Sequence, residues 1–357
     1  MRRRVVLPTV VAVLALVAAG VVGWVAFRPA STYARAIDAL PGATLRASYT
    51  DWREVRALAG GTTLGPASTG GQITAFLNRA YDRGLTPVSA LTGSVAAMQR
   101  LYGFSPLEAQ WESYGQSRQG AVDVLRLPDG TDFTSIEQDL RTLGYREPAS
   151  GLDRGGVWRG SGDLLAHLSG ALTPVQQNVV VLASRGMVLM SDSPEYAASA
   201  AAVVRGDAPS LGSTPGVSSL TAVAGSPVSA MLWSRDFACA DLSMGNASAG
   251  DQRAGAQLVA GVGGVNPLSG LVMAQQPTGA MTVGMLFEDS SQASENLQPR
   301  VDLASGPAPG QGGSFPARFR ITSARASGSS VVLQLRPRPG ERLLADLSEG
   351  PVLFATC

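Results

Sequence analysis

The feature that most constrains this chain is an uncharged, mostly apolar run from Val5 to Phe27, with three arginines before it and only Arg28 directly behind it. A helix rises 1.5 Å per residue, so about 20 apolar residues are enough to cross a hydrocarbon core of about 30 Å. Positive charge is retained on the cytoplasmic side of a membrane. We therefore expect a single-pass protein of the cell membrane, with its N-terminus in the cytoplasm and the rest of the chain extracytoplasmic.

A cleaved secretory signal is the alternative interpretation of this segment. Signal peptides have a shorter apolar region, of about 7–15 residues, followed by a small-x-small cleavage site. The candidate site here, Thr32-Tyr33-Ala34, fits poorly, and Trp24 and Phe27 suit the outer membrane interface. These residues favour an uncleaved anchor, although both interpretations place the bulk of the chain outside the cytoplasm.

The composition excludes several reaction classes. All 28 basic residues are arginine, so the chain cannot have a Walker-type lysine, a pyridoxal Schiff base or a Ser-x-x-Lys acyl-enzyme. A net charge of +1 gives no electrostatic reason to expect a nucleic-acid partner. A hydrophobic content of 45% with 15% charged residues is typical of a globular protein.

The chain has two cysteines, Cys239 and Cys357. An even number of cysteines in an exported chain indicates a disulfide. We expect these two to be paired, which would close a loop of about 120 residues and stabilise the fold by up to about 5 kcal/mol in the chain-entropy model. Two unpaired thiols are the alternative.

A hairpin followed by a helix recurs along the chain. Valine-rich or alternating segments at 178–190, 271–287 and 317–336 each contain a short turn and precede a helical segment. The entry segment LRASYT–DWREV also resembles VSAMLW–SRDFACADL. The predicted fold class is α+β: an N-terminal transmembrane helix followed by two similar extracytoplasmic α+β halves with antiparallel sheets packed against helices. The predicted boundaries are 1–4 cytoplasmic stub, 5–27 transmembrane helix, 28–43 tether, 44–208 first domain, 209–226 linker and 227–357 second domain.

Ser105-Pro106-Leu107-Glu108 has the pattern of a helix N-terminus, with a capping serine, proline at the first helical position and glutamate at the capping-box position. It predicts a helix that carries Trp111 and Tyr114. The same motif, extended to 103–108, occurs with Tyr-Thr-Asp-Trp at 49–52 and Leu-Gly-Tyr at 143–145. Together with the anchor, these motifs make the chain resemble a group of uncharacterised actinobacterial single-pass envelope proteins. That resemblance implies an envelope location and carries no known activity.

Metal and nucleotide sites find little support in the sequence. One histidine and two cysteines without metal-ligand spacing do not make a zinc site, and Asp129-Gly130-Thr131-Asp132 lacks the calcium-loop pattern. Gly261-Val262-Gly263-Gly264 follows a predicted helix, whereas a dinucleotide loop follows a strand. We expect a helix end there, and no cofactor.

Catalytic constellations are equally weak. His167 lies four residues after Asp163 on a predicted helix, so the two could share a face and act with a nearby serine as a hydrolase. The G-x-S-x-G elbow is absent, and a helix histidine beside a carboxylate is the simpler interpretation. Nothing in the sequence brings together two of the carboxylates that a glycosidase would need, among Glu108, Glu112, Asp123, Glu137 and Asp139.

The sequence therefore favours a non-catalytic binding or accessory module of the cell envelope. Its expected partners are the membrane, through the N-terminal helix, and an envelope protein or a lipid. A carrier of an apolar ligand is the first alternative, and a hydrolase that uses His167 is the second.

Overall fold

The computed structural model describes residues 30–149 and 156–357. The predicted stub (1–4) and transmembrane helix (5–27) lie outside the described residues. Within the described ranges, no helix combines the length and apolar character that crossing a membrane requires.

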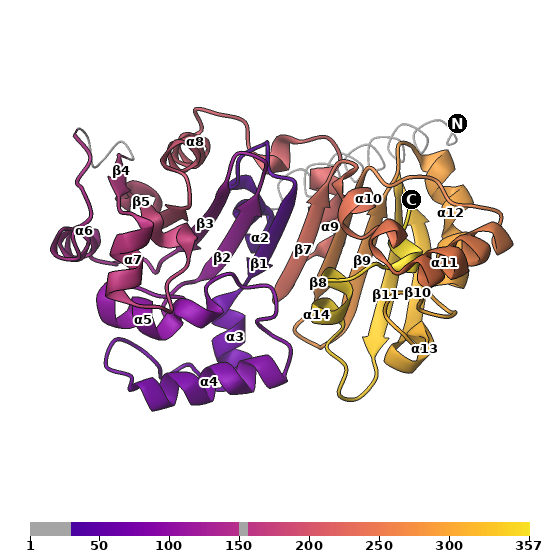
Figure 1. The fold of residues 1–357 in the computed structure, drawn as a ribbon, viewed down its shortest axis with the longest axis horizontal. Helices are drawn as coiled ribbons and strands as arrows, with labels where there is room; N and C mark the ends of the chain where they lie inside the picture. Colours follow the sequence, from indigo (N-terminus) through magenta and orange to yellow (C-terminus); the bar gives the residue numbers. More distant parts are fainter. Residues whose placement is uncertain (1–29, 150–155) are drawn as a thin grey trace, which may run out of the picture.

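The strands of the described chain form one sheet of 11 strands in the order β10-β11-β9-β8-β7-β1-β2-β3-β6-β5-β4 (Figure 1). Every neighbouring pair is antiparallel. The strands are β1 (Arg46–Thr50), β2 (Trp111–Gln116), β3 (Ala121–Arg126), β4 (Val157–Arg159), β5 (Asn178–Leu182), β6 (Met187–Ser191), β7 (Ser229–Ser234), β8 (Gly270–Gln275), β9 (Met281–Leu286), β10 (Phe319–Ser327) and β11 (Ser330–Pro337).

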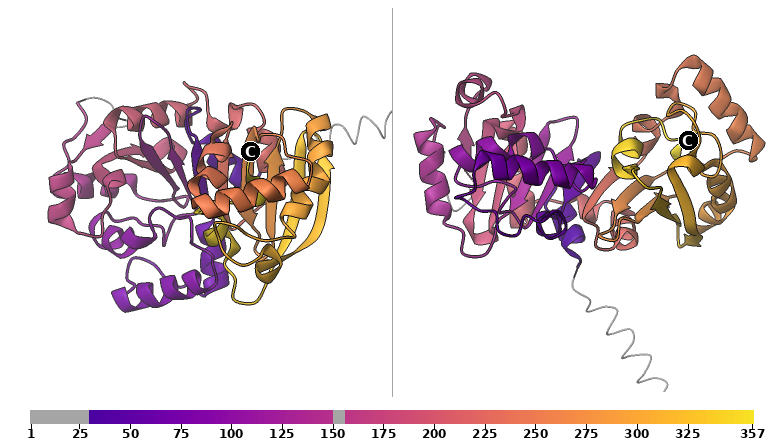
Figure 2. Two further views of the ribbon diagram at one scale, coloured as in Figure 1. Left: turned by 45° about the vertical axis from the view of Figure 1, so that its right-hand side comes forward. Right: turned by 90° about the horizontal axis from the view of Figure 1, so that it is seen from below.

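Helices cover both faces of this sheet, as the two views in Figure 2 show. One face, which we call the α9 face, packs against α2 (Thr32–Asp38), α8 (Pro194–Arg205) and α9 (Val217–Ala224). The opposite face packs against α3 (Trp52–Ala59), α4 (Gly70–Asp82), α5 (Val95–Leu101), α6 (Phe133–Thr142) and α7 (Gly162–Leu168) in the first part of the chain. In the second part it packs against α10 (Phe237–Asp241), α11 (Ala249–Gly261), α12 (Ser290–Leu303), α13 (Phe315–Arg318) and α14 (Leu343–Ser348).

Side-chain alternation explains why the sheet is covered on both faces. In β7, Met231 and Trp233 are buried in the core of the opposite face, while Ala230 and Leu232 are buried against the α9 face. Successive side chains of a strand point to opposite faces, so a strand that is apolar at every position must be covered twice. The α+β class with a large antiparallel sheet packed against helices is thus the observed fold.

Apart from the additional edge strand β4, the strand order is the same on both sides of the central β1–β7 pair. It is β1-β2-β3-β6-β5 on one side and β7-β8-β9-β11-β10 on the other. The predicted hairpins are confirmed as β5–β6, β8–β9 and β10–β11, and helices follow each of them. The strands do not form a separate sheet in each half, because β1 and β7 pair over their full length.

Two connecting segments differ from the prediction. The predicted tether 28–43 contains α2, whose Tyr33 and Ile37 are buried, and the predicted linker 209–226 contains α9, whose Leu220 is buried. In both, apolar residues recur at helical spacing and form a stripe that covers the sheet. Because both segments are rich in Pro, Gly and Ser, their composition predicts connecting loops, and the two short apolar stripes are missed.

The predicted helix after Ser105 is also wrong. Residues 106–108 form a turn, in which Leu107 N–H donates to Ser105 Oγ at 3.1 Å, and Trp111 and Tyr114 lie on strand β2. They point to opposite faces of the sheet, since their positions differ by three, an odd number. The residues after the capping pattern lack an apolar stripe at helical spacing. The hydrogen bonds that β2 makes with β1 and β3 therefore decide the conformation of this segment.

Candidate functional site

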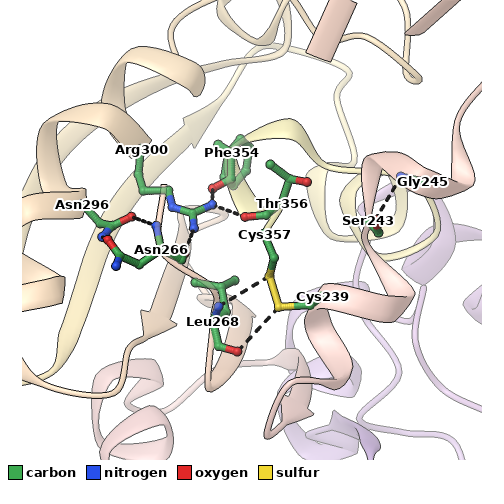
Figure 3. Close-up of a disulfide and its surroundings, with 10 residues drawn as sticks. All are labelled: Cys239, Ser243, Gly245, Asn266, Leu268, Asn296, Arg300, Phe354, Thr356 and Cys357. Carbon is green, nitrogen blue, oxygen red and sulfur yellow. Dashed lines mark hydrogen bonds between the residues drawn. A yellow bond between two sulfur atoms is a disulfide. The ribbon is translucent and has the colours of Figure 1, made fainter. Parts of the chain in front are cut away.

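The structure contains the Cys239–Cys357 disulfide, with the two Cα atoms 5.4 Å apart (Figure 3). Cys239 lies on α10, and Cys357 is the last residue printed in the sequence. Leu268 N–H lies 3.5 Å from the Cys357 sulfur, which joins the bridge to the segment before β8. The disulfide therefore fastens the end of the chain to the core of the second part.

Arg300 of α12 holds the same end of the chain from the other side (Figure 3). Its side chain is fully buried, with 0% exposed. One Nη donates to the carbonyl oxygens of Phe354 and Thr356, at 3.0 and 2.5 Å, and the other donates to Asn266 O at 2.6 Å. Burial lowers the pKa of Arg300 to about 9, so it stays charged at neutral pH. These contacts are structural, because they join the guanidinium to backbone carbonyls of the same chain.

His167 and Asp163, the predicted hydrolase pair, are both exposed on α7. In the part of the chain that the structure describes, neither shares a hydrogen bond or ion pair with the other. Ser161 is engaged as the N-cap of the same helix and accepts from Leu164 N–H at 3.1 Å. The geometry thus supplies no base–orienter contact of the kind a catalytic triad needs.

Glu112 on β2 and Asp123 on β3 are brought together by the sheet. Both point to the opposite face and are fully buried, at 1% and 0% exposed. Glu112 accepts hydrogen bonds from Trp52 Nε1 at 2.8 Å, Ser89 Oγ at 2.8 Å and Ala90 N–H at 2.7 Å. Neither carboxylate oxygen of Asp123 receives a hydrogen bond from a donor group among the described residues.

A proton explains this arrangement. Burial and the neighbouring Glu112 carboxyl raise the pKa of Asp123 well above its ordinary value. Burial also raises the pKa of Glu112, against the lowering effect of its three donors. Both directions favour a protonated carboxyl in this pair, since like charges at short range disfavour ionisation of both groups. Because the pair has no contact with solvent, it cannot act on a substrate in this structure.

An open hollow of about 470 Å³ lies on the opposite face of the first part, and we call it the Arg56 cleft. Its floor is apolar, and its rim carries the carboxylates of Glu108 and Asp132. The lining residues are Arg56, Leu64, Gly65, Pro66, Gly103, Phe104, Leu107, Glu108, Leu127, Pro128, Thr131, Asp132, Ser135 and Ile136. A volume of this size is typical of small-molecule sites, which span about 300–1,000 Å³.

Arg56 fixes one wall of this cleft. Its Nη1 donates to the carbonyl oxygens of Pro106 and Ala109, at 3.3 and 2.8 Å, and burial lowers its pKa. On the same wall, Gln99 Nε2 donates to Glu108 Oε1 at 3.1 Å. The 103–108 motif singled out in the sequence is therefore a wall of a cleft and not a helix N-terminus.

No group of three or more metal-ligating side chains occurs among the described residues. The Gly261–Gly264 segment ends α11 and continues as a turn, as the sequence predicts. Sequence reasoning missed the Arg56 cleft, because its lining comes from segments up to 80 residues apart that only the sheet assembles.

Comparison with known proteins gives no family. No family model matches the chain, and no curated protein matches it. Among solved structures, crystal form I of TP0453 aligns with 89% of this chain and 97% of its own, at 8% sequence identity and a TM-score of 0.41. A likeness at that TM-score carries no argument about function.

Proposed function

We propose that this chain is a membrane-anchored, extracytoplasmic binding module of the cell envelope, and that the Arg56 cleft is its binding site. The observation that carries the proposal is the cleft itself: an apolar floor, a polar rim and a wall held by Arg56. Such a combination of apolar surface with a few placed polar groups is typical of ligand sites.

The location rests on two independent features. The apolar run 5–27, with its preceding arginines, is long enough to anchor the chain. The Cys239–Cys357 disulfide is of the kind that persists in oxidising compartments and is rare in the cytosol.

The same strand order on both sides of β1–β7 further supports two similar extracytoplasmic α+β halves, one of which carries the cleft.

The charge of the rim indicates the class of ligand. The lining holds one guanidinium, that of Arg56, and two carboxylates, those of Glu108 and Asp132, so its net charge is negative. We infer a ligand of a few hundred daltons with an apolar face and hydroxyl or cationic groups. A cluster of side chains on an envelope protein could supply the same apolar and hydroxyl or cationic groups.

Filling the cleft tests this assignment. A Cβ at Gly65 would meet no atom within 4 Å, so Gly65→Trp places an indole in the cleft without strain on the backbone. Gly170→Trp is the matched control, because a Cβ at Gly170 would likewise meet no atom within 4 Å and Gly170 does not line the cleft. Native mass spectrometry of the full chain, purified from membranes without reductant, would measure any bound mass.

We expect the wild type and Gly170→Trp to retain a mass of a few hundred daltons and Gly65→Trp to lose it. A bare chain in all three samples, including after incubation with an envelope extract, would contradict a binding site in this cleft. A lipid mass retained equally by all three would favour the apolar-ligand carrier, with its site elsewhere.

A further inference from the structure

Four exposed arginines gather at the β10 edge of the sheet. Arg320 and Arg325 lie on β10, Arg336 lies on β11, and Arg338 follows directly after β11. We call these four the arginine surface. Three of them line an open hollow of about 540 Å³ together with the turn 278–280, and no acidic residue lines it.

The arginines repel one another in this structure. Arg320 and Arg336 are directly opposite in the β10–β11 ladder, where like charges are destabilising. In the described ranges 30–149 and 156–357, none of the four makes an ion pair with a carboxylate, although other arginines, such as Arg126 with Asp129, do so. A surface of one sign without internal compensation favours an anionic partner.

Three of these side chains, those of Arg320, Arg325 and Arg336, project from the α9 face, whereas Arg338 Nε donates to Pro316 O of α13 at 3.1 Å. In β11, Leu333 and Leu335 are buried against the opposite face, so Gln334 and Arg336 point to the α9 face. A chain of hydrogen bonds runs there from Ala224 O at the end of α9, through Gln276 and Thr282, to Gln334. Arg336 is the next residue of β11 after Gln334 on this face, and α9 does not cover the sheet there.

The first described residues leave the fold on the same face. Ala30 and Ser31 line a hollow together with Ser218 and Thr221 of α9. The segment that would lead to an anchor in residues 5–27 therefore starts from the α9 face, which also carries the arginine surface. Only residues 28 and 29 separate the predicted anchor from Ala30, so an anchor at 5–27 would bring a membrane close to this face.

We infer that the arginine surface docks onto anionic phospholipid headgroups of the membrane that anchors the chain. The inference rests on the membrane anchor of the proposed function. Guanidinium groups suit this role, because they remain charged and donate in a planar fork that matches phosphate oxygens. Each basic residue near an anionic surface strengthens binding by a factor of about 5. Docking would hold the sheet against the bilayer, with the opposite face and the Arg56 cleft turned outward.

An environment-sensitive fluorophore on the surface tests docking. Ser323 is exposed and lies opposite Gln334 in the ladder, so Ser323→Cys carries the label next to Arg336, while the native disulfide does not react in the absence of reductant. The full chain is reconstituted into nanodiscs of phosphatidylcholine alone, or with about a third phosphatidylglycerol. Quenching by headgroup-labelled lipid reports the docked fraction.

We expect quenching in anionic nanodiscs only, and its loss as salt is raised, since screening weakens such contacts. Arg320→Gln with Arg336→Gln should lower the ratio of docked to undocked chain by roughly 25-fold. The matched control is Arg100→Gln with Arg253→Gln, which removes two exposed arginines from helices on the opposite face.

Each other outcome is informative. Equal quenching in neutral and anionic nanodiscs, or an equal loss in both double variants, would overturn the inference. Aggregation of Arg320→Gln with Arg336→Gln without any change in quenching would show that the arginines only protect the sheet edge, as edge charges can. A wild-type chain that does not enter nanodiscs at all would instead contradict the anchor, which is a failure of the proposed function.

Discussion

Asp123 on β3 lies beside Glu112 on β2 in the core of the first part, with no solvent contact at either carboxyl group. Glu112 has three hydrogen-bond donors and Asp123 has none among the described residues. Burial and the neighbouring Glu112 raise the pKa of Asp123, so the folded structure favours a protonated carboxyl here, and loss of that proton has a cost in stability.

This relationship predicts how stability depends on pH. The pKa of Asp123 is raised in the folded state, so above about pH 4 the folded chain binds more protons than the unfolded chain. The free energy of unfolding therefore falls as pH rises from about 4 toward the folded pKa, with a slope of at most about 1.4 kcal/mol per pH unit for one proton.

Asp123→Asn removes this dependence, because an amide is neutral and can donate to Glu112. We expect the variant to exceed the wild type by about 1–3 kcal/mol at pH 8 and to match it at pH 4. Urea unfolding at a series of pH values measures this, with the exposed Asp163→Asn as control. A difference between Asp123→Asn and the wild type that is equal at pH 4 and pH 8 would be inconsistent with a protonated carboxyl in this pair.

Loss of the disulfide should destabilise the second part of the fold. The bridge joins residues separated by 118 positions. Cys239→Ser should lower the free energy of unfolding by about 2–5 kcal/mol, and reductant should have a similar effect on the wild type and none on the variant. Chemical denaturation with and without reductant checks this. Equal stability of oxidised wild type and Cys239→Ser would contradict it.

Arg300→Lys tests the buried guanidinium. Three backbone carbonyls depend on the two ends of its planar fork, and a lysine ammonium cannot reach them in the same geometry. We expect a loss of about 2–4 kcal/mol, since a buried acceptor left without a donor is costly. Arg253→Lys on exposed α11 is the control and should be neutral. Wild-type stability in Arg300→Lys would show that these hydrogen bonds contribute little.

The continuous sheet predicts that both parts unfold together. Arg46 of β1 lies opposite Trp233 of β7, with the guanidinium carbon 5.9 Å from the indole centroid. Because β1 and β7 are central strands, we expect their amide protons to exchange only through global unfolding. Hydrogen exchange with mass spectrometry measures this. Markedly faster exchange in either strand would indicate two independent units.

Local patterns predicted much of this fold. Alternating residues with a Gly-containing turn gave the hairpins β5–β6 and β8–β9, and the helical segments predicted after them are observed as α8 and α12. These elements are set by residues close in sequence, which is why a single sequence reveals them.

The carboxyl pair and the arginine surface could not be predicted in this way. Glu112 and Asp123 meet only because β2 and β3 pair in one particular register, and the predicted helix over Trp111 placed Glu112 on the wrong element. Arg320 and Arg336 become neighbours only through the β10–β11 register, which contains an irregularity between Ile321 and Ser323. The register between two paired strands is set by burial of the whole sheet and not by the local propensity of either strand.

The central claim is that the folded chain lies outside the cytoplasm on a membrane anchor. Protease treatment of intact spheroplasts, followed by mass spectrometry without reductant, tests it most directly. We predict that the chain pellets with carbonate-washed membranes, that external protease cleaves sites after residue 30, and that one cross-linked peptide contains both Cys239 and Cys357. A chain in the soluble fraction, protected from external protease and with both cysteines labelled as free thiols, would contradict the account.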